Sequence, residues 1–153
     1  MKAIFSILFN LLLLSACGSK SGLVRTGAFY DIPAKFVRSS AGKDFFIAYG
    51  KGLDEQECRN DANRKLLKTL IYEGSREGTQ IPPALSSNTS IAAFKAEEQR
   101  LLSLWSANEA LLENKGSPVN RMKQSEEKNT VHQLSFEIGI DRNLLNTELA
   151  KFK

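Results

Sequence analysis

The chain has 153 residues, with 21 Lys and Arg against 17 Asp and Glu, one His, and a formal net charge of +4. Hydrophobic residues make up 42% and charged residues 25%, which excludes collagen-like, low-complexity and wholly disordered chains. A large share of the apolar residues lies in the first fourteen positions, and the remainder suits one domain of about 100–120 residues.

The first seventeen residues have the layout of a secretory signal peptide. Lys2 gives a short positive segment, and the stretch from Ala3 to Leu14 is apolar apart from two polar residues. This run of about 12 residues is too short to cross the hydrocarbon core of a bilayer, which takes about 20. We therefore expect residues 1–16 to be a signal peptide rather than a membrane anchor or a buried core helix.

The residues Leu14-Ser15-Ala16-Cys17 resemble a bacterial lipobox. The resemblance implies that the Cys17 sulfur receives a diacylglycerol group, and that cleavage before Cys17 frees an amino group for a further acyl chain. Two or three acyl chains hold a protein on a membrane stably, whereas one holds it only marginally. Gly18 at the next position favours, by the same resemblance, sorting to the outer membrane. We therefore expect a lipid-anchored protein of the cell outer membrane.

Residues 17–27 are typical of a Gly/Ser-rich linker, and residues 28–153 are expected to form a single domain. Between positions 18 and 43 there are five cations and one anion, so the net positive charge lies beside the lipid, where anionic headgroups attract each cation by about 1 kcal/mol. Arg25, Lys35 and Arg38 are therefore candidates for surface or partner contact, although a solvated linker fits the same charges. Nucleic acid is not expected as a partner of an exported protein with this charge.

The first half of the domain predicts an extended arm, a strand and a helix. Pro33 restricts the arm over residues 28–37 to an edge strand or an extended segment. Residues 44–50 predict a buried strand that ends in a turn at residues 50–52. Residues 53–73 predict a helix that Asp54 caps with Glu57, while Leu53 packs on Cys58 in a hydrophobic staple. Cys58 would then be a small buried side chain, whereas Asn60, Asn63 and Arg64 fall on the predicted polar face.

The second half begins with a predicted loop over residues 73–88. A helix is predicted from Asn88 or Thr89 to about Asn114, with Gly116 ending it. Residues 118–125 and 130–140 are predicted to form a β-hairpin. The alternation in 130–140 gives one apolar and one polar face, which suits an antiparallel sheet covered on one side. Glu137 lies on the polar face and is a candidate for partner contact. Asp141 caps a short last helix. The order β-α-α-β-β-α predicts an α+β fold with a small antiparallel sheet of about three strands and helices on one face.

Short motifs along residues 33–150 resemble a known lipoprotein family. These motifs are the arm Pro33-Ala34-Lys35-Phe36-Val37, the turn Tyr49-Gly50-Lys51-Gly52, the helix start with Asp54, Glu57 and Ala62, and the strand 134–140 before Asp141. The chain resembles the family of bacterial surface lipoproteins named after a twenty-kilodalton Helicobacter antigen, which includes relatives needed for flagellar assembly. Phe36 stands where the family has Trp. The resemblance implies a structural or interactive role and carries no catalytic residue.

Motifs for catalysis, metal binding or phosphate binding are absent from the sequence. His132 is the single histidine, and no further ligands stand at metal-ligand spacing around it. A Cys58–His132 dyad is the one conceivable nucleophile pair, although nothing in the sequence brings the two residues together. We therefore expect no catalytic residues, no metal and no cofactor, and a protein that is not an enzyme.

Two functions stay open at this point. One is a structural or adaptor component of a cell-envelope assembly, held to the membrane through Cys17 and contacting an envelope protein or a second copy of itself. The other is a periplasmic small-ligand or cell-wall-binding module, in which Phe29, Tyr30, Phe36 and Tyr49 line a groove. Convergent polar groups in a pocket would favour the binding module, and their absence the adaptor.

Overall fold

The computed structural model describes residues 33–75, 80–126 and 129–153. Several predicted features lie outside these residues: the signal peptide, the expected lipidation site Cys17, the linker, Arg25, and two of the arm aromatics, Phe29 and Tyr30. The described elements are β1 (Lys35–Ser40), β2 (Lys43–Gly52), α2 (Glu55–Lys68), the π-helical η2 (Thr69–Glu73), α3 (Asn88–Ser106), β3 (Leu112–Glu126), β4 (Asn129–Ile140), α4 (Arg142–Leu149) and the 3-10 helix η3 (Ala150–Phe152).

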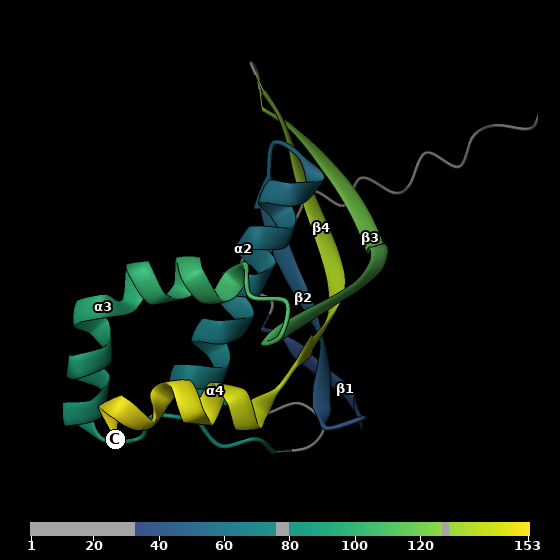
Figure 1. Ribbon diagram of the computed structural model, residues 1–153. Coiled ribbons are helices and arrows are strands. Elements are labelled where there is room, and N and C mark those ends of the chain that lie inside the picture. Colours follow the sequence, from purple (N-terminus) through teal and green to yellow (C-terminus); the bar gives the residue numbers. More distant parts are fainter. Residues whose placement is uncertain (1–32, 76–79, 127–128) are drawn as a thin grey trace, which may run out of the picture.

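The fold is α+β, as the sequence predicts, with an antiparallel sheet in the order β1-β2-β4-β3. The helices α2, α3 and α4 lie on one side of this sheet (Figure 1). The expected count of about three strands is too low, because β1 is a separate edge strand that pairs with β2. An isolated antiparallel bridge also joins Ser75 to Ile81.

The core lies between the sheet and the helices. The even-numbered residues of β2 and β4, among them Phe46, Phe136 and Ile138, join α2 and α3 in one buried cluster that includes Trp105. Each large apolar side chain that is fully buried contributes about 1.5–3 kcal/mol. The odd-numbered residues of β4 face the other side, so the predicted alternation of apolar and polar residues is confirmed. The expectation that this second face is solvated is wrong, because Gln133 and Ser135 are only 8% and 1% exposed.

Gly50 and Gly52 serve a different purpose from the predicted turn. Both lie inside β2 and pair with β4, so the turn prediction over residues 50–52 is wrong. A Cβ atom on Gly50 would lie 1.8 Å from the backbone oxygen of Cys58. The glycine is needed because α2 packs directly against the strand backbone there.

The start of α2 follows the prediction at its cap. The Glu57 amide donates to Asp54 Oδ1 at 2.8 Å, and the Leu53 amide donates to Glu57 Oε2 at 2.8 Å. The predicted staple is wrong, because the Leu53 side chain is 57% exposed whereas Cys58 is fully buried. The Cys58 thiol instead donates to the backbone oxygen of His132 at 3.3 Å.

The second helix ends earlier than expected. α3 stops at Ser106, and residues 112–114 already belong to β3. The side-chain oxygen of Asn108 accepts hydrogen bonds from the Ala110 amide at 3.0 Å and the Leu111 amide at 3.3 Å. This Asx-type turn supplies local partners that compete with the helix and so redirects the chain.

A large irregularity divides β3. Lys115 pairs with Glu137 of β4, but the next pair is Asn120 with Ser135, so residues 116–119 are looped out. Gly116 has φ +64°, a left-handed backbone that glycine adopts without strain. Pro118 is tolerated there because a bulge does not need its missing amide.

Candidate functional site

Two of the predicted contact residues are partners of each other. Arg38 of β1 and Glu137 of β4 form an ion pair at 2.6 Å that spans β2, and the Arg38 guanidinium lies 4.4 Å above the ring of Phe45. The Phe45 ring packs over Gly139, where a Cβ atom would approach it to 2.6 Å. Lys35 is exposed on the edge strand β1. Arg38 and Glu137 therefore cover part of the sheet face that carries no helix.

The conceivable nucleophile Cys58 is held in its protonated form. Burial of the thiol, assisted by the nearby carboxylates of Asp61, Asp54 and Glu57, raises the pKa of Cys58 to about 11. A reactive cysteine needs the opposite environment, one that lowers its pKa. The contact between Cys58 and His132 runs through the backbone oxygen of His132 rather than its imidazole, so this contact does not pair the thiol with a histidine base.

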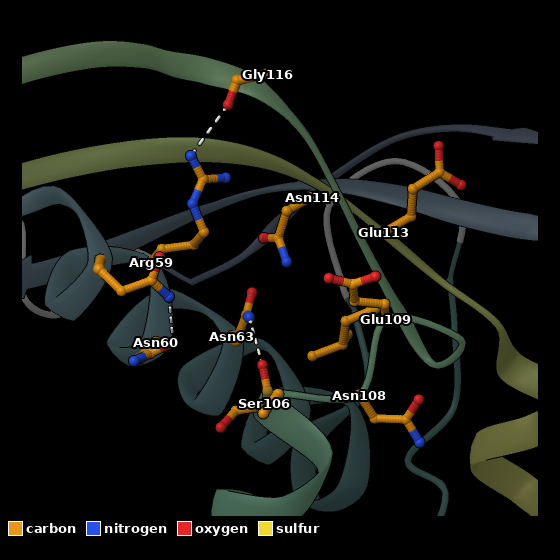
Figure 2. Close-up of a pocket in the computed structure, with 12 residues that line it drawn as sticks. Arg59, Asn60, Asn63, Ser106, Asn108, Glu109, Glu113, Asn114 and Gly116 are labelled. Atoms are coloured by element: carbon orange, nitrogen blue, oxygen red, sulfur yellow. Dashed lines mark hydrogen bonds between the residues drawn. The ribbon is translucent and has the colours of Figure 1, made fainter.

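A polar pocket lies on the helix side of the sheet. It has a volume of about 700 Å³ and opens between α2, the end of α3 and the start of β3 (Figure 2). Its wall includes Arg59, Asn63, Ser106, Glu109 and Asn114, with Leu112 as an apolar part. Amide and carboxylate groups thus converge from three elements that are far apart in the sequence.

Asn63 is the most deeply buried polar residue of this pocket, with 1% of its surface exposed. Its Nδ2 donates to the backbone oxygen of Ser106 at 2.8 Å. Because a backbone carbonyl only accepts hydrogen bonds, this contact fixes which end of the amide is nitrogen. Within the described chain, the buried Oδ1 has no hydrogen-bond partner. The prediction that Asn63 lies on a solvated face is wrong.

Asn114 brings a second unpartnered oxygen to the same pocket. It lies on β3 opposite Ile138 of β4, on the side that faces the helices. Its Oδ1 is also buried and has no partner among the described residues. In Figure 2 the side chains of Asn63, Asn114 and Glu109 point toward a shared space. Buried polar atoms are usually satisfied, and an unsatisfied one costs about 1–3 kcal/mol.

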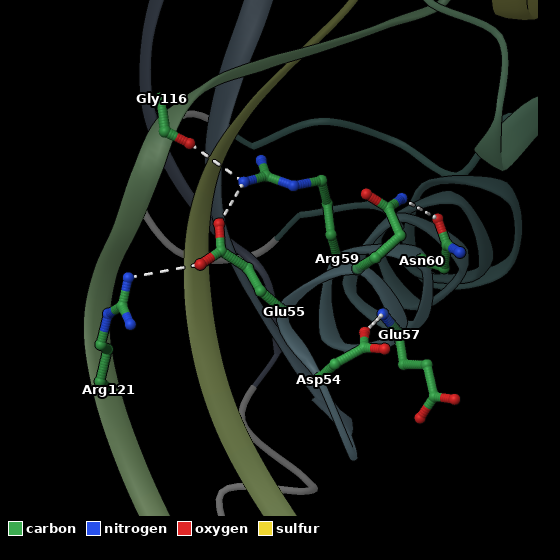
Figure 3. Close-up of polar contacts among 8 residues, drawn as sticks. Asp54, Glu55, Glu57, Arg59, Asn60, Gly116 and Arg121 are labelled. Atoms are coloured by element: carbon green, nitrogen blue, oxygen red, sulfur yellow. Dashed lines mark hydrogen bonds and ion pairs between the residues drawn. The ribbon is translucent and has the colours of Figure 1, made fainter.

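Arg59 forms a fixed rim of the pocket. It donates to the Gly116 carbonyl oxygen at 3.0 Å and to Glu55 Oε1 at 3.1 Å, while Glu55 Oε2 meets Arg121 at 3.3 Å (Figure 3). The guanidinium also lies 4.4 Å above the ring of Phe136. These contacts tie the β3 bulge to α2, and the single carboxylate of Glu55 is shared by the guanidinium groups of Arg59 and Arg121.

Two carboxylates, those of Glu109 and Glu113, also line the pocket. Glu113 forms an ion pair with Lys43 at 3.0 Å. In the part of the chain that the structure describes, Glu109 is exposed and forms no ion pair. The pocket wall therefore carries both signs of charge, together with amide groups that can donate as well as accept hydrogen bonds.

Comparisons with protein-family models, with curated proteins and with solved structures found no match for this chain. The resemblance to the Helicobacter-type lipoproteins stays a prediction. Among the described helices, none combines the length and the hydropathy needed to span a membrane. Within residues 33–75, 80–126 and 129–153, no three His, Cys, Asp or Glu side chains gather in a group that could hold a metal ion.

Proposed function

We propose that the protein is a lipid-anchored binding protein of the cell envelope, whose pocket between α2, α3 and β3 takes a small polar ligand. The observation that carries the proposal is the pair of buried amide oxygens, on Asn63 and Asn114, that lack hydrogen-bond partners in one pocket. Of the two functions that the sequence leaves open, these convergent polar groups favour the small-ligand or cell-wall-binding module.

Contacts within the chain hold the pocket wall in place. The Ser106 carbonyl oxygen already holds the Asn63 amide in place, and the contacts of Arg59 hold the β3 bulge against the helix. Both oxygens have almost no exposed surface, and a ligand that reaches and donates to them would remove the cost of leaving them unpaired, about 1–3 kcal/mol each. Preorganised groups of this kind lose little entropy when a ligand arrives.

The binding proposal is tested with the full-length protein in detergent, exposed to a small-molecule extract of bacterial envelopes. Native mass spectrometry should show a retained solute on the wild type and none on Asn114→Leu, which fills the pocket with an apolar side chain. Asn143→Leu, on the exposed side of α4, is the matched control and should retain the solute. A wild type that retains nothing, or an Asn114→Leu variant that retains as much, contradicts the proposal.

The membrane location is proposed on the lipobox at Cys17, with binding on the outer membrane rather than in solution. Cys17→Ser should abolish labelling by a fatty-acid probe and partitioning into a detergent phase, because the sulfur that accepts the lipid is gone. Unchanged labelling would show that Cys17 is not the anchor.

An adaptor role is the second candidate, and the edge strand β1 favours it. β1 pairs only with β2 among the described strands, and five of its six residues are exposed. Such an edge offers backbone groups to an added strand from an envelope protein or a second copy. A photo-crosslinker attached at Val37→Cys should then capture a partner in intact cells. The same group at Leu104→Cys on α3 should not, although Leu104 is 61% exposed against 44% for Val37. Equal capture at both positions would refute the adaptor role.

A further inference from the structure

We infer that the ligand of the pocket is a neutral ring with several hydroxyl groups, such as a sugar, whose hydroxyls accept from the amide nitrogen of Asn114 and donate to the carboxylate of Glu109. The inference rests on the proposed function, since it names the chemical class of the bound solute. A free monosaccharide and the end of a glycan chain share this chemistry.

The first argument is that a donor and an acceptor face the same space. Figure 2 shows the Asn114 amide nitrogen turned into the space that this side chain shares with Asn63 and Glu109. In the part of the chain that the structure describes, this nitrogen has no hydrogen-bond partner and Glu109 forms no ion pair. An amide NH2 group only donates hydrogen bonds, and an ionised carboxylate only accepts them. A hydroxyl group does both, so a ligand with hydroxyl groups satisfies the two side chains together.

The second argument is that ionic groups fit only one of these two side chains. An ammonium group has three N–H donors and no acceptor, so it could bind Glu109 but would set its own donors against the nitrogen of Asn114. A carboxylate or phosphate group could accept from Asn114 but would be repelled by the like charge of Glu109. A neutral ligand avoids both conflicts.

The third argument is charge balance. The charged side chains that line the pocket or pair with its wall are Arg59, Arg121 and Lys43, with Glu55, Glu109 and Glu113. The positive and negative charges in this set are equal in number, so the pocket has no net formal charge with which to attract an ionic ligand.

The rest of the wall suits a ring with several hydroxyl groups. Gln56, Asn60 and Asn108 also line the pocket, and their carboxamide groups can donate and accept hydrogen bonds. Ala107 adds an exposed apolar part, against which the C–H groups of a ring can pack. The volume of about 700 Å³ lies within the range of about 300–1,000 Å³ that is usual for small-molecule sites.

The test is calorimetric titration of the full-length protein in a detergent without a sugar headgroup. Glucose and N-acetylglucosamine represent free sugars, and the disaccharides cellobiose and diacetylchitobiose represent the ends of glycan chains. Each is paired with its fully O-methylated derivative, which keeps the oxygen acceptors but has no O–H donor. At least one sugar should bind with a Kd of about 1 mM or tighter, and about tenfold more tightly than its methylated derivative, which cannot donate to Glu109. Tighter binding of the monosaccharide or of the disaccharide identifies the source.

Three further probes represent the other ligand classes. Cadaverine carries only cations, glutarate carries only anions, and acetylalaninamide is a neutral amide without a hydroxyl group. None of the three should bind as tightly as the best sugar.

Two variants locate the binding. Glu109→Gln should weaken sugar binding about tenfold, because a hydrogen bond to a charged acceptor becomes a neutral one. Glu109 is exposed, so this variant should keep the wild-type midpoint of urea unfolding. Glu73→Gln removes an exposed carboxylate at the end of η2, outside the pocket, and should leave the affinity unchanged.

The outcomes separate the two proposals. The sugar inference is overturned if cadaverine, glutarate or acetylalaninamide binds more tightly than every sugar, if the methylated sugars bind as tightly as the free ones, or if Glu109→Gln leaves sugar binding unchanged. It is also overturned if no sugar binds. In each of these cases, retention of an envelope solute by the wild type but not by Asn114→Leu decides separately whether the pocket function holds.

Discussion

Replacing Asn63 with Asp should destabilise the fold in a pH-dependent way. At neutral pH the change sets a carboxylate against the Ser106 carbonyl oxygen, 2.8 Å from the present donor, at a position that is 1% exposed. A carboxylate cannot donate a hydrogen bond, so two acceptors would face each other and the charge would be buried without a partner. An unpaired buried charge costs about 3–5 kcal/mol.

The sign of the pH dependence follows from the raised pKa of the introduced carboxyl. Burial disfavours its charged form, so its pKa is higher in the folded than in the unfolded chain, where it is about 3.9. Below about pH 3.9 the group is protonated in both states, and its O–H can donate to Ser106. The penalty then grows as the pH rises above 3.9 and levels off at the folded pKa. A folded pKa of about 7 corresponds to about 4 kcal/mol at pH 7.

The assay is urea unfolding of the full-length protein in detergent, with each variant compared with the wild type at pH 3.5 and pH 7. Asn63→Asp should lose about 4 kcal/mol relative to the wild type at pH 7 and less than about 1 kcal/mol at pH 3.5. Asn63→Leu is the control without a charge. It should show the same difference at both pH values, because it leaves Ser106 unpaired but also removes the unpartnered Oδ1. An equal loss at both pH values for Asn63→Asp would refute the assigned geometry.

Three further variants test the packing around the site. Cys58→Ala should lower the free energy of unfolding by about 1 kcal/mol. Because burial raises the pKa of Cys58 to about 11, thiol reagents should modify the native wild type slowly at pH 7. Fast modification would contradict the burial of Cys58. Gly50→Ala should lower the free energy of unfolding by several kcal/mol or prevent folding, because the new Cβ atom would clash with the backbone oxygen of Cys58. Stability against urea close to that of the wild type would show that α2 does not approach β2 this closely. Glu137→Lys should lower the free energy of unfolding by up to about 1 kcal/mol, because it breaks the partly exposed ion pair with Arg38. In a double-mutant cycle, adding Arg38→Glu should recover part of this loss. Additive losses would mean that the two residues do not interact.

The sequence predicts those parts of the fold that depend on nearby residues. The caps at Asp54 and Asp141 are present because each side chain accepts from the amide three residues later. The alternation in β4 is equally local. β1 is missed as a full strand, since its residues are almost all exposed and show no apolar alternation. α3 ends early because of the turn at Asn108. The apolar residues on either side of Asn108 keep a helical spacing, so the sequence pattern predicts a longer helix.

The pocket was predictable only in part. Asn63 stands three residues before Leu66 and seven before Leu70, both on the buried face of the helix, so its spacing already indicates burial. Because asparagine is polar, Asn63 is instead assigned to the solvated face of the helix. The meeting of Asn63 with Asn114 depends on how β3 packs against α2, and 50 residues separate the two in the sequence. No local pattern carries that information.

The pairing of Arg38 with Glu137 changes which surface an envelope partner would use. With these two residues closed over Phe45, neither offers a free charge, so a partner that docks on this face would first have to break their contact. The edge of β1 carries no such cost, because its outer backbone groups have no strand beside them among the described residues. The pocket lies on the helix side of the sheet, where residues of α2, the end of α3 and the start of β3 line it. Ligand binding in the pocket and strand addition at β1 therefore use separate surfaces, and loss of one in a variant should leave the other intact.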